Sequence, residues 1–334
     1  MTDSVCKAFH SKWMNEDSVE LHAESYSAII IPKYGANVIA LDNSEYNARL
    51  LRTPKDAASF IQMPHVYGLP LLFPPNRISG GRFEYGGREY VLPVNEPEAG
   101  NHLHGHLNQC SFKVEDLSAS GEQAHAVMSF SSKSNSEFYS GIPNDFTVRV
   151  KFVLSPSGLR HTVTIINEGC FPLPIGFGFH SAFSIPFIND TDPKEYKILC
   201  SVDEHWPMDS NHNTAGFMKT DPEIQNAFRQ SGFDPMGDLP AQWSAKPMTY
   251  SGKPFHGAVI RNQGEGVDLV YEVSDAFKFW VFWNQGGGKG FVCMEPQTWM
   301  INAPNCGLDA SISNFSAIKE HSQEIYETLL YLRR

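Results

Sequence analysis

The sequence predicts an all-β protein: a large antiparallel β-sandwich, formed as one domain over residues 1–334, with a few short helices. Three observations favour this class. Many short segments alternate apolar and polar residues with a period of two, turn residues separate them at short intervals, and helical patterns are few. The chain shows no repeat, low-complexity tract or linker that would divide it, and 334 residues fit one large all-β domain.

The clearest strand patterns lie near one another in the sequence. Residues 83–94 predict two short strands joined by Gly86-Gly87, which is a hairpin signal. Residues 146–155 and 161–167 alternate apolar and polar side chains, and residues 125–132 could pair with them. Further strands are expected where aromatic and β-branched residues gather: 26–43, as two strands around Tyr34-Gly35, then 276–284 and 291–295.

Helical signals are short. Residues 54–63 and 221–230 each begin with a proline near an acidic residue, which is typical of a helix start. Residues 203–257 are rich in Pro, Gly, Asp and Asn, and we expect long loops there.

The bulk properties exclude several classes of function. The net charge is −11, the pI is near 5.6, and Lys and Arg do not cluster, so a nucleic-acid surface is not expected. No apolar run approaches the roughly 18 to 20 residues that cross a bilayer. The start of the chain lacks a secretory signal, and the six cysteines form no CxxC pair. These features predict a cytoplasmic protein with reduced thiols.

One unusual run, "NHLHGH", places His102, His104 and His106 at every second position. On a strand these three side chains would point to one face. A metal site is disfavoured because no carboxylate lies in the run. Two interpretations remain open, solvated loop histidines or a site for a hydroxyl-rich ligand, because a neutral imidazole both donates and accepts hydrogen bonds.

Two further residues are candidates for proton transfer. His180 lies among aromatic residues and glycines in "GFGFHSAF", and it is either a core residue or an imidazole whose pKa suits catalysis. Glu295 follows the apolar "GFVCM" and precedes Pro296. It is either a solvated carboxylate at a strand end or, if buried, a base with a raised pKa.

Other residues suggest ligand binding. Arg77 follows two prolines and precedes a glycine pair, so it is either a surface arginine or a clamp for a sugar hydroxyl. Trp280, Trp283 and Trp299 are expected in or near the core, although one at a cleft could form a platform for a sugar ring.

Together these motifs resemble the aldose 1-epimerase (galactose mutarotase) family. That family has an Asn-Arg pair before a glycine-bounded strand pair, then Asn-x-Leu-His-Gly, a later histidine, and Glu-Pro-Gln-Thr. This chain has "NRISGG" from Asn76, "NHLHGH" from Asn101, then His180, and "EPQT" from Glu295, in the same order. The similarity covers residues from about 70 to 310, and the combination is more specific than either motif alone.

The resemblance implies the galactose mutarotase-like β-sandwich, with an open cleft for a monosaccharide. It implies that Glu295 is the general base and His180 the general acid of a ring opening that interconverts the α and β anomers of a hexose. No metal or other cofactor is implied. We expect the two groups to face each other across a gap about one pyranose wide.

The resemblance also implies sugar-binding roles for Arg77 and His104, helped by Asn76. A substrate-binding aspartate is expected in the later loop region, and we assign it to Asp238, with Asp234 as the alternative.

The chain departs from the family pattern at two places. "SAFSIPF" follows His180 where many mutarotases have Tyr-Phe-Asn, and "GH" replaces the usual glycine pair after Leu-His. These departures leave open a sugar-binding or regulatory module without catalysis. A hexose-phosphate 1-epimerase is a further alternative, with Arg82 or Arg88 as a second cation, and so is a metal-dependent isomerase that uses the histidine run.

Overall fold

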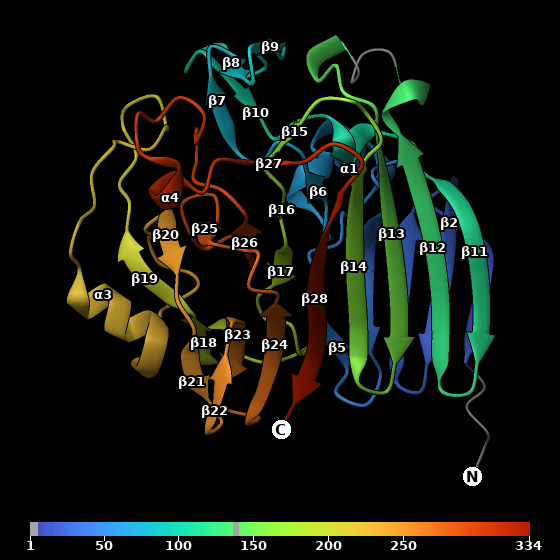
Figure 1. Ribbon diagram of the computed structural model, residues 1–334. Helices are drawn as coiled ribbons and strands as arrows, with labels where there is room; N and C mark the ends of the chain where they lie inside the picture. The colour runs from blue at the N-terminus through green and yellow to red at the C-terminus, as the bar shows by residue number, and fades with distance from the viewer. Residues whose placement is uncertain (1–5, 136–139) are drawn as a thin grey trace.

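A computed structural model describes residues 6–135 and 140–334 (Figure 1). Its longest sheet is antiparallel and has eight strands. In spatial order these are β11 (Lys113–Ser120), β12 (Gln123–Ser131), β13 (Phe146–Ser155), β14 (Gly158–Asn167), β28 (Gln323–Arg333), β24 (Val267–Val273), β23 (Gly257–Asn262) and β18 (Tyr196–Cys200).

A five-stranded sheet packs against one end of the long sheet, over β11, β12 and β13. In Figure 1 it lies behind the green strands. Its strands are β1 (Lys7–Trp13), β2 (Glu16–Ala23), β3 (Tyr26–Ile31), β4 (Asn37–Asn43) and β5 (Ala48–Arg49).

A seven-stranded sheet covers the other half of the long sheet. Phe183 and Trp280 of this sheet both contact Tyr271 of β24 edge-on, with ring centroids 5.4 and 6.4 Å away. Its strands are β19 (Val202–His205), β20 (Gln242–Ala245), β25 (Phe279–Trp283), β26 (Phe291–Gln297), β16 (Gly178–Phe179), β6 (Leu71–Leu72) and β17 (Ala182–Ser184), which pairs with β26.

The alternation in the sequence explains these layers. In β13 the residues Phe146, Val148, Val150, Phe152 and Leu154 are all fully buried, and the residues between them are more exposed. Successive side chains of a strand point to opposite faces, so one face enters the core. The predicted all-β class with antiparallel sheets is therefore confirmed.

Four two-stranded ribbons complete the strands of the described residues. The predicted Gly86-Gly87 hairpin is confirmed, because both glycines have positive φ angles, 57° and 74°, as a tight two-residue turn requires. The ribbons are β7 (Arg77–Ser79) with β10 (Asn101–Leu103), β8 (Arg82–Tyr85) with β9 (Arg88–Val91), β15 (Leu173–Ile175) with β27 (Ser316–Ile318), and β21 (Met248–Tyr250) with β22 (Lys253–Phe255).

The helices are short. Both predicted helices are confirmed: α1 (Ala57–Gln62), which Asp56 caps, and α3 (Pro222–Asn226), which continues into a π-type turn, η5 (Ala227–Ser231). Among the described residues, no helix is long and apolar enough to cross a bilayer. Further short helical turns are α4 (Ala310–Ser313), η1 (Pro64–Val66), η2 (Leu107–Gln109), η3 (Ser132–Ser134) and η4 (Pro193–Glu195).

One sequence expectation is wrong, and one central strand is not predicted. Residues 203–257 do not form only loops, because β19, α3, β20, β21 and β22 lie wholly or partly within them. The central strand β28 is absent from the prediction, although Tyr326, Thr328 and Leu330 alternate on its buried side. Its threonine and its glutamates dilute the apolar signal that marks a buried strand.

Candidate active site

A cavity of about 310 Å³ lies where the seven-stranded sheet meets the ribbon of β7 and β10. The structure brings five of the six predicted site residues together in its wall: Asn76, Arg77, His104, His180 and Glu295. Asp238 is exposed and lies outside this lining.

Strand register places His180 opposite Glu295. Gly178 pairs with Gln297 of β26, and Ala182 pairs with Cys293 of the same strand. His180 is midway between Gly178 and Ala182 in the sequence, and Glu295 is midway between Gln297 and Cys293. The two residues therefore lie beside each other. β26 continues past Glu295 to Gln297, and Glu295 is therefore an internal strand residue with 1% exposure.

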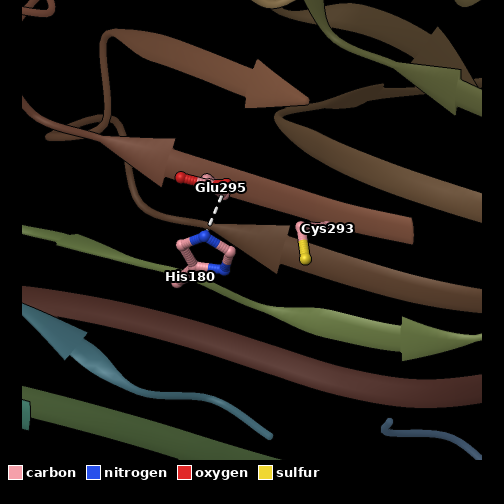
Figure 2. Close-up of side chains that lie close together, drawn as sticks. All are labelled: His180, Cys293 and Glu295. Atoms are coloured by element: carbon pink, nitrogen blue, oxygen red, sulfur yellow. Dashed lines mark ion pairs between the residues drawn. The ribbon is translucent and has the colours of Figure 1, made fainter. Parts of the chain in front are cut away.

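The two side chains are in direct contact. Nε2 of His180 lies 3.2 Å from Oε1 of Glu295 (Figure 2). The expected gap of one pyranose width is therefore wrong. Glu295 is buried, so it is not a solvated carboxylate at a strand end. His180 is also buried, and both side chains line the cavity.

Burial determines the protonation of this pair. It raises the pKa of Glu295 to about 8, against the opposing effects of the Arg77 charge and a hydrogen bond from Gln297. It also lowers the pKa of His180 well below the usual range for histidine, and the neighbouring His65 acts in the same direction. At neutral pH the pair therefore carries one proton, held mainly by the carboxyl group.

Arg77 is held in position by a carboxylate beside the cavity. Its Nε and Nη2 donate to the two oxygens of Glu96, each at 2.8 Å, and its Nη1 donates to Oδ1 of Asn76 at 3.2 Å. Asn101, the first residue of the histidine run, also donates to Glu96 at 3.0 Å. This two-pronged geometry fixes the plane of the guanidinium group.

His104 reaches the cavity because the chain turns before it. β10 ends at Leu103, and His104 and Gly105 have φ angles of 67° and 65°. The backbone N–H of His104 donates to the carbonyl of Asn76, which has a positive φ of 54°. A side chain at Gly105 would bring its Cβ to 1.9 Å from the Phe73 carbonyl oxygen, so only glycine fits.

The expectation that the three histidines share one face is wrong. The ring of His104 lies 5.0 Å from that of His180, measured between centroids. His102 instead forms a 2.7 Å hydrogen bond with the carbonyl of Pro93, and its ring contacts His106 at 5.2 Å. The left-handed backbone at His104 breaks the alternation on which the expectation relies.

His65, which the sequence analysis does not single out, also lines the cavity. Its ring lies 5.2 Å from that of His104 and 5.7 Å from that of His180, and burial lowers its pKa to about 4. It belongs to η1, a single turn without a recognisable motif. Trp283, one of the three candidate platform residues, lines the cavity with its ring 5.9 Å from that of His180.

The proposed phosphate-binding arginines lie elsewhere. Arg82 pairs with Glu89 across the β8–β9 hairpin at 2.9 Å, and both side chains are exposed. Arg88 donates to the carbonyl of Pro143 and lies over the ring of Phe171. Neither arginine lines the cavity.

Among the described residues, one group has the spacing of metal ligands. His180, Cys293 and Glu295 are all buried, and their donor atoms lie within 4.8 Å of one another (Figure 2). Burial raises the pKa of the Cys293 thiol well above its usual value. A metal ion would have to displace the protons of both the thiol and the carboxyl group, so this donor set is a poor fit at neutral pH.

Comparison with known proteins identifies the family. A family model described as aldose 1-epimerase matches residues 17–322. The chain belongs to the aldose 1-epimerase family. A galactose mutarotase-like protein from Clostridium acetobutylicum resembles this family member with 30% identity and a TM-score of 0.96, over 99% of this chain and 100% of that one.

More distant proteins are also similar to this epimerase-family chain, in fold or in sequence. The galactose 1-epimerase of Lactobacillus acidophilus NCFM is 12% identical with a TM-score of 0.72, over 98% of this chain and 99% of that one, which shows the shared fold alone. The Escherichia coli K12 protein YihR, described as uncharacterized, is 25% identical over 228 residues, or 68% of each chain. The predicted family and fold are therefore confirmed.

The raised pKa of Glu295 predicts a pH-dependent cost in stability. Between pH 6.5 and about 8 the unfolded chain has an ionised Glu295, whereas the folded protein keeps it protonated. The folded state then binds more protons, so its stability falls as pH rises through this window. Glu295→Gln cannot ionise. It should raise the free energy of unfolding by roughly 2 to 4 kcal/mol at pH 8, and less at pH 6.

Urea unfolding of the two proteins at pH 6, 7 and 8 measures this difference. Glu324→Gln, an exposed change on β28, is the matched control. Equal pH slopes for the wild type and Glu295→Gln would contradict the assigned protonation.

Proposed function

We propose that the protein is an aldose 1-epimerase, which interconverts the α and β anomers of a hexose by acid–base ring opening without a cofactor. The contact of His180 with Glu295 inside the cavity carries this proposal. Both groups can exchange protons with a bound sugar, and a buried pair with strongly shifted pKa values is typical of catalytic sites.

The short separation suits mutarotation. The anomeric hydroxyl oxygen O1 and the ring oxygen O5 are bonded to the same carbon, C1. The group that takes a proton from O1 and the group that gives one to O5 must therefore be close neighbours.

The reaction needs one mobile proton on the pair. The ionised form has Glu295 as a carboxylate and His180 as an imidazolium, and it contains as many protons as the neutral form. From the ionised form, Glu295 removes the O1 proton while His180 protonates O5, and the C1–O5 bond opens. Rotation about the C1–C2 bond, followed by closure with the roles reversed, gives the opposite anomer. Each positioned group typically contributes about 10² to 10⁴ in rate.

The rest of the wall has groups that suit a pyranose. Arg77, His104 and Asn76 offer hydrogen bonds for ring and hydroxyl oxygens, and Trp283 offers an apolar face for C–H groups. The volume of about 310 Å³ is near the lower end of the range for small-molecule sites, as expected for one monosaccharide.

A sugar-binding module without catalysis would need the same hydrogen-bonding groups. It would have no use for a buried carboxyl group in contact with an imidazole, because leaving such a group in the core costs stability. The pair therefore favours the enzyme.

Removing either proton carrier should abolish most of the activity. We expect Glu295→Gln and His180→Asn each to lower kcat by about 10² to 10⁴, because neither new side chain can exchange protons in the required way. Polarimetry of freshly dissolved α-glucose and α-galactose, and of hexose 6-phosphates, measures the relaxation to the anomeric equilibrium. Glu324→Gln should match the wild type. Wild-type rates equal to the buffer blank for every sugar would contradict the proposed function.

The shared proton also predicts the pH dependence of kcat/KM. The rate should be level from about pH 6.5 to 7.5 and should fall above about pH 8, where the pair loses its proton. The acid limb should lie well below pH 6.5, because the pKa of His180 is lowered. The measurement is the relaxation rate minus the buffer rate at each pH. A catalytic rate that still rises between pH 8 and 10 would show that the pair acts without this proton.

A further inference from the structure

A second cavity of about 420 Å³ adjoins the first. The two share three residues, His65, Leu103 and His104, which form a ridge between them. The side-chain amide of Asn95, which lines the second cavity, forms hydrogen bonds with Leu103 of this ridge. Its Oδ1 accepts from the Leu103 N–H at 2.6 Å, and its Nδ2 donates to the Leu103 carbonyl at 3.0 Å. The partition is thus fixed by the fold.

Besides the three shared residues, the lining of the second cavity has four side-chain amides and one tyrosine ring. Gln62 and Gln109 are exposed, and among the described residues their amides have no hydrogen-bond partner. Asn108 is only 2% exposed, yet its Oδ1 has no partner in the described structure. Tyr34 is held edge-on against Phe60, with ring centroids 5.0 Å apart.

Such a lining suits a sugar. Amides offer donors and acceptors together, as hydroxyl groups require. The lining residues include no Asp, Glu, Lys or Arg. Lys33 lies beside the lining, with its Nζ 5.2 Å from the centroid of the Tyr34 ring, and it pairs with Glu16.

The rim that joins the cavities carries exposed apolar side chains. Ile61 is 54% exposed and lines the second cavity, whereas Met63, two residues later, is 37% exposed and lines the first. Exposed apolar residues at the edge of a groove commonly mark a ligand-binding surface. One ligand that spans both cavities would contact both side chains.

We propose that the second cavity binds the second sugar unit of a reducing oligosaccharide. This inference rests on the proposed function, because the reducing-end ring must lie at His180 and Glu295, where its C1 is free to open. The first cavity has room for one ring, so the linked unit crosses the ridge of His65, Leu103 and His104 into the amide-lined cavity. The KM for a disaccharide or a longer chain is then lower than it would be without the second cavity.

Polarimetry of paired substrates tests this inference. Each monosaccharide that the protein accepts, glucose or galactose, is compared with 1→4-linked and 1→6-linked disaccharides that have the same reducing-end sugar. The test variant is Gln62→Ala/Gln109→Ala, which removes two exposed amides of the second cavity. Gln263→Ala, an exposed glutamine in the turn between β23 and β24, is the control.

We expect at least one linkage to give a wild-type kcat/KM equal to or above that of the monosaccharide. The double variant should lower this kcat/KM about tenfold, mainly through KM, and should leave the monosaccharide rate within about twofold. Equal losses for both substrates, or no loss for any disaccharide, would overturn the second site while leaving the proposed epimerase intact. No acceleration of any sugar would overturn both.

Discussion

The contact between His180 and Glu295 is the constraint on which the rest of the site depends. A carboxyl group with 1% exposure is costly to ionise, and no Lys or Arg of the described residues is in direct contact with this one. The protein meets that cost by keeping the proton within the pair and by placing Arg77 close enough to favour ionisation without forming a salt bridge to Glu295. The same balance allows the proton to move when a sugar binds.

The residues of the site lie on two kinds of backbone, paired strands and irregular segments. Glu295 lies on strand β26, and His180 lies in the short link between β16 and β17, whose pairing with β26 sets the separation of the two groups. Two of the three binding residues, Asn76 and His104, lie on irregular backbone with positive φ angles. Such backbone costs about 1 to 3 kcal/mol per residue and persists where its surroundings enforce it, which is common at functional sites. Glu96 gives Arg77 a comparable rigidity through paired hydrogen bonds.

The sequence predicts the fold class because the strands alternate, and it predicts five residues of the cavity because their motifs are local. It does not predict the distance between His180 and Glu295, which depends on the pairing of segments more than 100 residues apart. It misplaces the histidine run because nothing in "LHGH" shows that His104 adopts a left-handed conformation. His65 escapes notice because a single helical turn carries no periodic pattern. Asp238 is assigned from the expected order of motifs, and its side chain is exposed outside the cavity lining, although Ala241 of the same loop lines the cavity.

The buried pair of His180 and Glu295 holds one proton at neutral pH, mainly on the carboxyl group. Infrared difference spectroscopy of the wild type against Glu295→Gln at pH 7 observes this proton directly. We expect the C=O stretch of a protonated carboxylic acid in the wild type only, and we expect this band to fade as the pH is raised past about 8. If Glu295→Gln removes a carboxylate band at pH 7 and no protonated carboxyl band, the proton is not on Glu295 and this protonation is contradicted.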